Sequence, residues 1–429
     1  MASWLRRRPR APATKLKCKL KCKLKCKLKC DGRFGLATSS TPLYQCDLDE
    51  EPVQNYKVGG YHPVQIGDKL GGGRYKVLHK LGWGGFSTVW AANDQELGIN
   101  VALKIVQAAA SGDTRGLQTL KFLKDSSPQQ LGYNRLVKLH NVFQQEGPNG
   151  KHNCLVLDLT GPSVQDYINR HVDGFRLPGK AAKSIAKQAL EALSCLHSSG
   201  ICHGDLHNQN LALGIPSLAR LDQKDFYQAL GDPRKEQVTR SDGGELEPHV
   251  PPYLVKPAPF ADEQHLDLHD LKLVDFGASF RGEIGSQSLL NPSVIRAPEQ
   301  FFGEKLDFRV DLWSMGCTLF ELVCGQTPFE SGNSTPESIA KQMIYMVKDD
   351  FPVQWQDKRR QIERQTPESP SSTLQQWLKV VYFESEDKAD FTRSEIEQIS
   401  HIIARLMKFE PGSRASADDI LQDPWFAED

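Results

Sequence analysis

The stretch His203–Asn210, with the sequence HGDLHNQN, decides how the rest of this 429-residue chain is interpreted. It has the form His-x-Asp-x-x-x-x-Asn, in which Asp205 can accept a proton from a hydroxyl nucleophile. Asn210 lies five residues further on, where a loop that turns back can present its amide oxygen to a metal ion. Magnesium prefers such hard oxygen ligands. A base beside a metal-holding amide suits phosphoryl transfer to an alcohol, which depends on positioning and charge neutralisation.

Two pieces of sequence before this stretch point to phosphate binding. Tyr75–Leu81 (YKVLHKL) alternates as a strand should and leads into Gly82–Val89 (GWGGFSTV). Glycines between two strands let backbone N–H groups approach phosphate oxygens, although a plain tight turn would have the same composition. Lys104 follows inside the strand-like Asn100–Val106, where an unpaired ammonium would be costly to bury. A phosphate beside Lys104 would explain both pieces together.

Further motifs follow the central stretch. Leu271–Val274 is a predicted strand that ends in Asp275-Phe276-Gly277, which places a carboxylate where it can reach a metal ion. Ala297-Pro298-Glu299 begins 22 residues after Asp275. A nearly all-apolar helix is predicted from Asp311 to Val323, as expected for a buried central helix.

Residues 213–270 are rich in proline and charge, and we expect them to form an insertion on the surface. Structureless loops longer than about 15 residues are uncommon inside a compact domain. The insertion would leave the surrounding site intact if its two ends paired as a hairpin.

The charge of the chain is unevenly distributed. Residues 1–30 repeat Lys-Leu-Lys-Cys four times and carry twelve Lys or Arg and no acid, which leaves 41 basic against 53 acidic residues, a formal charge of −12. We expect the leader to be disordered because it cannot bury enough apolar surface. It is compatible with an organellar or nuclear targeting signal, with metal capture, or with no role. No apolar run reaches the length of a membrane span.

Taken as an ordered set, these motifs resemble the eukaryotic protein kinases over about residues 61–429, and their order is far more specific than any one of them. The set comprises the glycine-rich residues 82–89, Lys104, His203–Asn210, Asp275–Gly277, Ala297–Glu299, Asp311 and Arg414. More narrowly, Tyr61–Asp68 (YHPVQIGD), Leu81–Trp90 (LGWGGFSTVW) and the HGDLH at 203–207 resemble the SR-protein kinases, especially fungal members.

This resemblance implies an α+β, two-lobed fold and a set of roles. We expect a disordered leader and linker at 1–60, a small β-rich lobe at 61–160, and a larger helical lobe at 161–429 that carries the insertion. ATP and Mg²⁺ are the implied cofactors. The implied catalytic residues are Asp205, Lys104 and His207; Asn210 and Asp275 would hold the metal; Leu81, Gly82, Gly84, Gly85, Val89, Ala102, Lys104, Asp158 and Thr160 would bind ATP, with Leu157 as gatekeeper; Glu299 would pair with Arg414.

Four positions depart from the pattern of the family. Ser87 replaces the third glycine of the loop, a change that the family tolerates. Gly204 replaces the usual arginine before Asp205, so we expect activity without a phosphorylated activation loop. His207 replaces the usual lysine and, neutral at its ordinary pKa, would support the phosphoryl group less well.

The fourth departure is the glutamate that should brace Lys104. Thr119 stands at its position, and no glutamate occurs between Lys104 and Glu146. Asp113 is the acid nearest in sequence and lies too close to the strand. The lysine would then be poorly oriented, which predicts reduced activity.

Three hypotheses follow from the resemblance. The first is a serine/threonine protein kinase of SR-protein-kinase type, whose acidic body receives Arg/Ser-rich proteins. The second is a weak or inactive scaffold with a kinase fold, for which Thr119 is the discriminating feature. The third, a small-molecule phosphotransferase, is disfavoured by the Ala-Pro-Glu motif. We expect a monomer in the cytoplasm and nucleus, with no direct binding to nucleic acid or membrane.

Overall fold

The computed structural model describes residues 42–427, apart from 49, 127–129, 173–175, 261, 330–334, 366–371 and 386–388. The basic leader at residues 1–30 therefore lies outside the described residues. Among the helices that are described, none is both long enough and apolar enough to cross a membrane.

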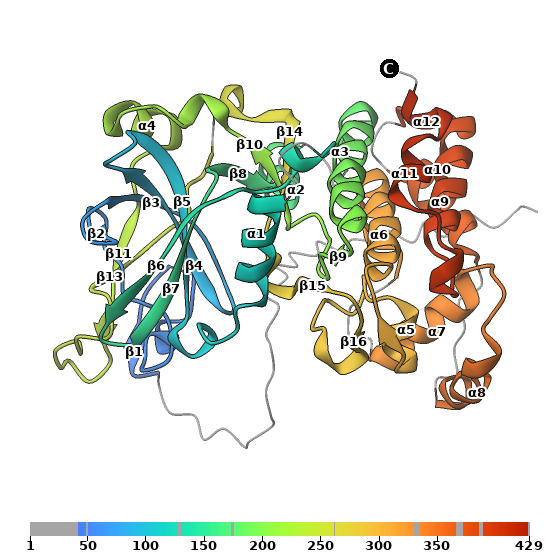
Figure 1. The fold of residues 1–429 in the computed structure, drawn as a ribbon, viewed down its shortest axis with the longest axis horizontal. Helices are drawn as coiled ribbons and strands as arrows, with labels where there is room; N and C mark the ends of the chain where they lie inside the picture. Colours follow the sequence, from blue (N-terminus) through green and yellow to red (C-terminus); the bar gives the residue numbers. More distant parts are fainter. Residues whose placement is uncertain are drawn as a thin grey trace, which may run out of the picture. The chain divides into compact units, whose positions relative to one another are not determined.

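Six antiparallel strands form the largest described sheet, in the order β2-β3-β4-β5-β7-β6 (Figure 1). They are β2 (Lys69–Leu70), β3 (Tyr75–Gly84), β4 (Ser87–Asp94), β5 (Ile99–Val106), β6 (Leu139–Gly147) and β7 (Gly150–Leu157). Strands β3 and β4 pair down to Gly84 and Ser87, so the glycine-rich residues form the tip of a hairpin. Helix α1 (Arg115–Ser126) packs beside β6 and against the residues that follow Asp275.

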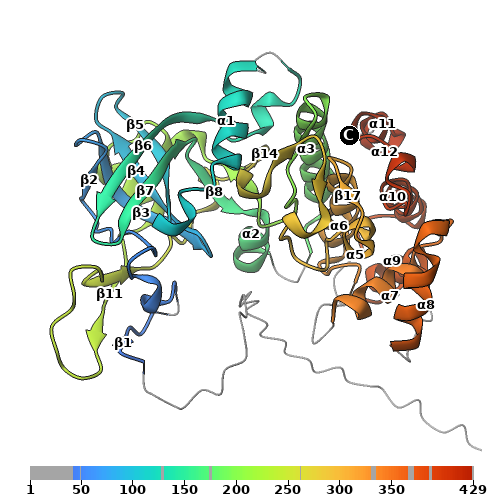
Figure 2. The same cartoon turned by 60° about the horizontal axis from the view of Figure 1, so that its bottom comes forward.

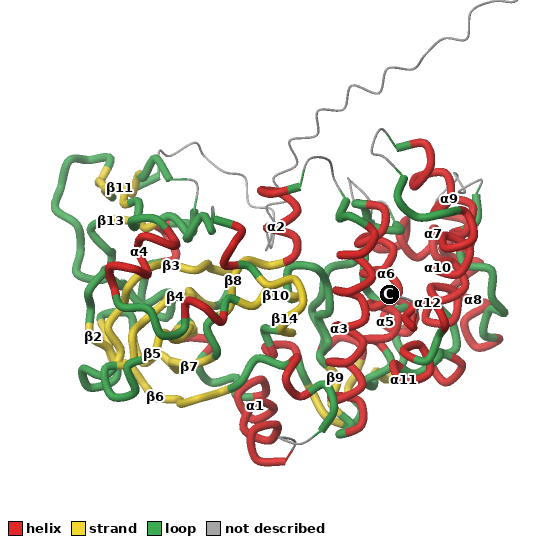
Figure 3. The backbone as a smooth tube through the Cα atoms, turned by 90° about the horizontal axis from the view of Figure 1, so that it is seen from above, coloured by secondary structure: helices red, strands yellow, loops and turns green. Residues whose placement is uncertain are grey.

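A second sheet of three strands, in the order β14-β10-β8, lies between the six-stranded sheet and the helices (Figure 3). Its strands are β8 (Thr160–Ser163), β10 (Leu211–Gly214) and β14 (Asp267–Leu273). Two short strand pairs accompany it: β9 (Ile201–Cys202) with β15 (Phe280–Arg281), and β16 (Ile284–Gly285) with β17 (Lys305–Leu306).

The helical part is built around α6 (Val310–Cys324), in which every residue except Glu321 is buried. Apolar side chains on all its faces favour this burial. The helices around it are α2 (Val164–His171), α3 (Gly179–Ser198), α5 (Pro298–Phe302), α7 (Pro336–Met346), α8 (Gln356–Gln365), α9 (Leu374–Glu384), α10 (Arg393–Leu406), α11 (Ala417–Leu421) and α12 (Pro424–Ala427). The expected α+β fold, with a β-rich lobe and a helical lobe, is confirmed.

Two segments that are distant in sequence meet beside the six-stranded sheet (Figure 2). One contains β1 (Tyr44–Gln45), and the other contains α4 (Gln223–Leu230), β11 (Lys235–Gln237), β12 (Thr239–Arg240) and β13 (Tyr253–Val255). Strand β1 pairs with β12, and β11 pairs with β13. Their apolar side chains form one buried cluster, which comprises Tyr44, Val53, Tyr56, Tyr61, Val238, Val250 and Leu254.

The first of these segments differs from the expectation. The sequence predicts a disordered leader and linker over residues 1–60, yet the described part of this range includes β1 and a short 3-10 helix at Val53–Asn55, and it buries Tyr56. The reason is that the few apolar residues of this part are covered by the inserted segment, whose Arg240 pairs with Tyr44 across 196 positions of the chain. The insertion itself leaves and re-enters the three-stranded sheet through β10 and β14, which pair with each other.

Candidate active site

Helix α6 fixes the loop that carries Asp205 through hydrogen bonds to the backbone of the loop. Asp311, in the first turn of α6, accepts hydrogen bonds from the backbone N–H groups of His203 (2.7 Å) and Gly204 (2.8 Å). His197 lies 3.1 Å from the same carboxylate. Burial alone would raise the pKa of Asp311, but the hydrogen bond from His197 and nearby histidine charge bring that pKa below its ordinary value. The ionised carboxylate therefore fixes the backbone just before Asp205.

The glycine at position 204 has a structural cause. Its φ is +81°, and a Cβ atom there would lie 2.7 Å from the carbonyl oxygen of Ala278 and 2.9 Å from a methyl group of Leu289. An arginine would be strained by its backbone and would collide with the residues that follow Asp275. Position 204 therefore has no room for the arginine that the sequence resemblance would lead us to expect there.

Asn210 and Asp275 stand at the ends of neighbouring strands. Leu211 pairs with Leu273, and the N–H of Val274 donates to the carbonyl oxygen of Asn210 (2.9 Å). The ladder between β10 and β14 therefore brings the two expected metal ligands together even though 64 residues separate them. Amide and carboxylate oxygens are a donor set that fits magnesium.

The two carboxylate oxygens of Asp205 differ in their hydrogen bonding among the described residues: Oδ2 has a partner and Oδ1 has none. The side-chain amide of Asn210 donates to the Asp205 carbonyl oxygen (2.8 Å) and to its Oδ2 (3.2 Å). Oδ1 is buried without a hydrogen-bond partner among the described residues. His207 Nδ1 accepts the N–H of Gln209 (3.2 Å), and its Nε2 lies 3.5 Å from Oδ1 of Asp205 and 3.2 Å from the side-chain nitrogen of Asn210. The Asp205 side chain is 26% exposed, so the hydroxyl group of a substrate can approach the carboxylate and supply the hydrogen-bond donor that Oδ1 lacks.

Lys104 reaches across to the loop after β14. Its Nζ lies 2.7 Å from Oδ1 of Asp275, joining residues that are 171 positions apart. The positive charge of Lys104 is the main reason that the pKa of Asp275 is lowered to about 2. Asp275 also adopts a φ of +61°, a conformation that costs free energy for a residue other than glycine and is often found at functional sites.

Thr119 does not replace the missing glutamate as a partner of Lys104. It is buried on α1, and its Oγ1 accepts a hydrogen bond from the hydroxyl of Ser279 (2.9 Å). Asp113 pairs with Arg115 (2.6 Å), so it is not directed to the lysine either. Among the described residues, Asp275 is the carboxylate that holds Lys104.

The glycine-rich tip has open space around its three glycines. A Cβ atom added to Gly82, Gly84 or Gly85 would meet no other atom within 4 Å, and none of the three has a positive φ. Neither backbone strain nor packing within the protein therefore requires glycine there. Space beside bare backbone N–H groups is what a phosphate group needs.

The residues expected around adenine lie on β3, β4, β5 and the connection after β7. Ala102 and Leu157 are neighbours across β5 and β7 and are both buried, while Leu81 and Val89 are partly buried. Asp158 is turned toward β6, because its N–H donates to the carbonyl oxygen of Lys138 (3.1 Å) and its carboxylate accepts the N–H of Lys138 (3.0 Å). Thr160 begins β8.

Two carboxylates on the helical side have contrasting environments. Glu299 forms a doubly hydrogen-bonded pair with Arg414 (2.7 and 2.6 Å), as expected. Glu321, which sequence reasoning missed, is the incompletely buried residue of α6 and interacts electrostatically with His207. Burial raises the pKa of Glu321. Only the fold brings this carboxylate near the catalytic loop, so the sequence carried no signal for it.

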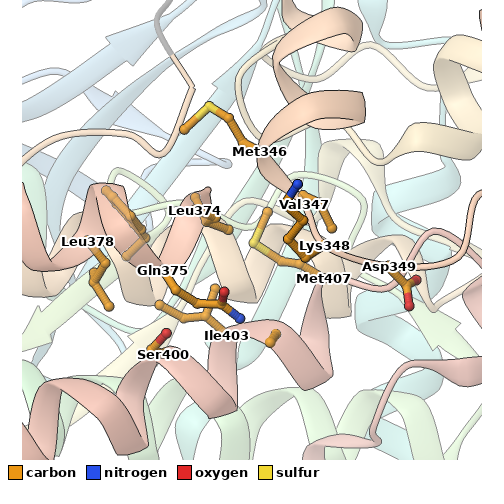
Figure 4. A pocket seen from close by; sticks show the side chains of 12 residues that line it. Met346, Val347, Lys348, Asp349, Leu374, Gln375, Leu378, Ser400, Ile403 and Met407 are labelled. Atoms are coloured by element: carbon orange, nitrogen blue, oxygen red, sulfur yellow. The ribbon is translucent and has the colours of Figure 1, made fainter. Parts of the chain in front are cut away.

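A separate shallow pocket opens between α6, α9 and α10 (Figure 4). Its wall is mostly apolar, with Met346, Leu378, Ile403 and Met407 among the lining side chains. It shares no residue with the group around Asp205, so it is not part of the candidate active site.

Comparisons with known proteins identify the same family that the sequence motifs resemble. A family model described as "Protein kinase domain" matches residues 75–220 and 260–426. A serine/threonine-protein kinase SRPK from Physarum polycephalum is 28% identical over 411 residues, covering 89% of this chain and 92% of that protein. Protein kinase dsk1 from Schizosaccharomyces pombe is 26% identical, covering 88% of this chain and 85% of that one.

Shorter and structural matches agree. SRSF protein kinase 3 from Homo sapiens is 39% identical over 174 residues, which cover 39% of this chain and 30% of that protein. A solved kinase domain superposes with a TM-score of 0.56 at 20% identity, covering 85% of this chain and 98% of that one. At that identity the match shows the fold. The family model passes over residues 221–259, which lie within the insertion.

Proposed function

Because this chain belongs to the protein kinase family, we propose that it transfers the γ-phosphate of ATP to serine residues in Arg/Ser-rich proteins. The chain is a serine/threonine protein kinase by its family and its relatives. The observation that carries the proposed chemistry is the linkage through Asn210, whose side chain binds Asp205 and whose backbone pairs with Val274, next to Asp275 of the Lys104–Asp275 ion pair. One group can accept the hydroxyl proton while the other two can engage phosphate and metal.

Each residue of the site has its own proposed role. Oδ1 of Asp205 accepts the proton of the substrate hydroxyl and aligns its oxygen. Lys104 holds the nucleotide phosphates, and the backbone of Gly82–Gly85 covers them. Asn210 and Asp275 would hold Mg²⁺, which, when bound, neutralises the charge of the transferring phosphoryl group. His207 lies beside Asp205, with its Nε2 3.5 Å from Oδ1, and would help to orient the carboxylate.

The proposed substrate class is supported by charge and by similarity. Outside the leader the chain carries a formal charge of −12, which favours a basic partner. Relatives that cover most of the chain are SRPK-type kinases. We also propose a cytoplasmic and nuclear location and a monomeric state, which fit a kinase of this type.

The test uses the full chain with Mg²⁺ and ATP. An Arg/Ser repeat peptide is compared with a peptide in which every arginine is replaced by alanine, and Asp205→Asn serves as the catalytic control. We expect phosphoserine on the Arg/Ser peptide, little on the alanine peptide, and none with the control variant. Equal labelling of both peptides would contradict the substrate class.

The scaffold hypothesis has its own outcome in the same experiment. It is favoured by the absence of a carboxylate at Thr119, which leaves Asp275 to serve both Lys104 and the metal. Thermal stabilisation of the chain by ATP without transfer to either peptide would support a scaffold. No stabilisation by ATP would refute the nucleotide site itself.

A further inference from the structure

Residues 44–62 and 235–255 form a structure that we call the clasp, and it lies outside the part matched by the family model. Its two halves are joined by the β1–β12 pair and by a shared apolar cluster. At its edge, Tyr44 donates a hydrogen bond to Glu247, which also pairs with Arg240. The clasp is therefore a packed unit with its own apolar core. It can restrain the motion of the residues that it contacts.

The clasp contacts β3 just where that strand becomes the glycine-rich tip. Lys80 of β3 forms a buried ion pair with Glu51, which also accepts a hydrogen bond from the hydroxyl of Tyr56 (2.7 Å). The indole N–H of Trp83 donates to Glu50 (3.2 Å). Glu51 and Glu50 of the clasp thus contact Lys80 and Trp83, which lie on either side of Gly82.

Tyr61 makes the contact closest to the tip. Its hydroxyl donates to the carbonyl oxygen of Gly84 (2.8 Å), while its side chain is 1% exposed and packs edge-to-face on Tyr56 with ring centres 5.5 Å apart. Gly84 offers no side chain through which the tip could be fixed. A hydrogen bond to its backbone is therefore one of the few ways for the rest of the protein to restrain it.

The backbone of Tyr61 is itself fixed at both polar groups. Its N–H donates to the carbonyl oxygen of Asn55 (3.0 Å), and its carbonyl oxygen accepts the side-chain amide of Asn149 (2.6 Å). The same amide donates to the carbonyl oxygen of His249 (3.0 Å) in the inserted half of the clasp. Gly60 precedes Tyr61 in a turn so tight that a Cβ atom would lie 1.9 Å from the Asn55 oxygen. The hydroxyl thus extends from a rigid base.

We propose that Tyr61 is a positioning residue that holds the glycine-rich loop over the nucleotide phosphates. This inference rests on the proposed function, because it assumes that the loop covers ATP. A loop with three glycines loses much conformational freedom when it closes on a ligand. A loop that is already held in place loses less on binding and therefore binds more tightly.

The test compares two tyrosines that donate to carbonyl oxygens of the same strand. Tyr61→Phe removes the hydrogen bond to Gly84, and Tyr227→Phe removes a matching one to Leu78 (3.0 Å), six residues before the tip. Dissociation constants for MgATP and for adenosine are measured by calorimetry on the full chain. We expect Tyr61→Phe to weaken ATP binding about three- to tenfold, the usual effect of one hydrogen bond, and to leave adenosine binding unchanged. Tyr227→Phe should change neither.

Several outcomes would overturn the proposal. ATP binding by Tyr61→Phe at the wild-type affinity would show that the tyrosine only supports folding. Equal losses for ATP and adenosine would show general damage rather than an effect at the phosphates. Failure of the wild-type chain to bind ATP would refute the proposed function and this inference together.

A second variant guards against misfolding of the first. Glu50→Ala removes the hydrogen bond from Trp83 at the surface and leaves the buried cluster intact. It should weaken ATP but not adenosine, by a smaller factor than Tyr61→Phe. An unchanged ATP affinity in this variant, with Tyr61→Phe unfolded, would also count against a positioning role for the clasp.

Discussion

At the scale of single residues, Gly204 shows how the loop before Asp205 restricts the sequence. A side chain at this position would destabilise the fold in two ways, through the positive φ and through a 2.7 Å approach of its Cβ atom to the carbonyl oxygen of Ala278. Gly200 has a similar φ of +64° but open space around it, so it isolates the first cost. We predict that Gly204→Ala lowers the free energy of unfolding by about 1–3 kcal/mol more than Gly200→Ala, the usual range for overpacking.

Urea unfolding of the two variants measures this difference. Phosphate transfer should also fall in Gly204→Ala, since Asp205 is the next residue, and should stay near wild type in Gly200→Ala. Equal unfolding free energies would mean that the segment after Asp275 yields easily.

The pair formed by Glu299 and Arg414 allows a second prediction at this scale. Their side chains are 2% and 0% exposed, so Glu299→Gln leaves a buried guanidinium without its charge partner. Breaking such a pair typically costs about 3–5 kcal/mol. Glu146→Gln breaks a pair of similar length to Lys151 on an exposed hairpin and should leave the unfolding free energy unchanged within error. Chemical denaturation measures the unfolding free energy of both variants. A small loss of unfolding free energy in Glu299→Gln would contradict the predicted bracing role.

Sequence reasoning at the residue scale succeeded where a motif fixes the backbone and failed where a contact is made by the fold. The sequence predicted both Asn210 and Asp275 as companions of Asp205; Asn210 contacts Asp205, the ladder between β10 and β14 brings Asn210 and Asp275 together, and their role as metal ligands stays a prediction. The hydrogen bond between Ser279 and Thr119 had no signal in the sequence, because it joins residues 160 positions apart.

At the scale of elements, the insertion is part of the packing of the small lobe. Phe226 of α4 is fully buried against Leu78 and Ala91 of the six-stranded sheet, together with Leu218. We predict that Phe226→Ala lowers the free energy of unfolding by about 3–5 kcal/mol, as for other large buried aromatic residues. Lys224→Ala, on the exposed side of the same helix, should change it by less than about 0.5 kcal/mol. A similar small effect for both would show that the insertion merely decorates the surface.

Periodicity predicted the regular elements and failed on the irregular ones. The predicted strand at Asn100–Val106 and the predicted helix at Asp311–Val323 correspond to β5 and α6 within a residue. Helix α4 was hidden in a segment rich in proline and charge. Its buried residues, Phe226 and Leu230, are too few to give a pattern, and they are buried only because the sheet is there to receive them.

At the scale of the whole molecule, the stability of the chain should depend on buried neutral histidines. His62, His79 and His152 are 7%, 1% and 0% exposed, and the rings of His62 and His152 lie 4.9 Å apart. Burial, and then the neighbouring His152, lower the pKa of His62 to about 4, and burial lowers the pKa of the other two. In the unfolded chain a histidine has a pKa of about 6.5.

The direction of the pH dependence follows from these shifts. Between about pH 6.5 and 4 these histidines bind more protons in the unfolded chain than in the folded one, so their contribution to the free energy of unfolding falls as the pH is lowered through that window. Asp275, whose pKa is lowered to about 2, acts in a lower window, since its contribution is lost only below the unfolded carboxyl pKa of about 4. Glu50 and Glu321, whose pKa values are raised mainly by burial, oppose the histidines.

The difference between wild type and His62→Phe therefore isolates one histidine from these opposing groups. We predict that the wild-type unfolding free energy falls more steeply from pH 6.5 to 4.5 than that of His62→Phe, and that the difference between the two curves changes by about 2 kcal/mol over that range, the part of the His62 shift that lies within it. Urea unfolding at intervals of half a pH unit measures both curves. Parallel curves would mean that His62 gains a proton in the folded state, for which its Nδ1, buried without a partner among the described residues, would need a water molecule or a movement of the clasp.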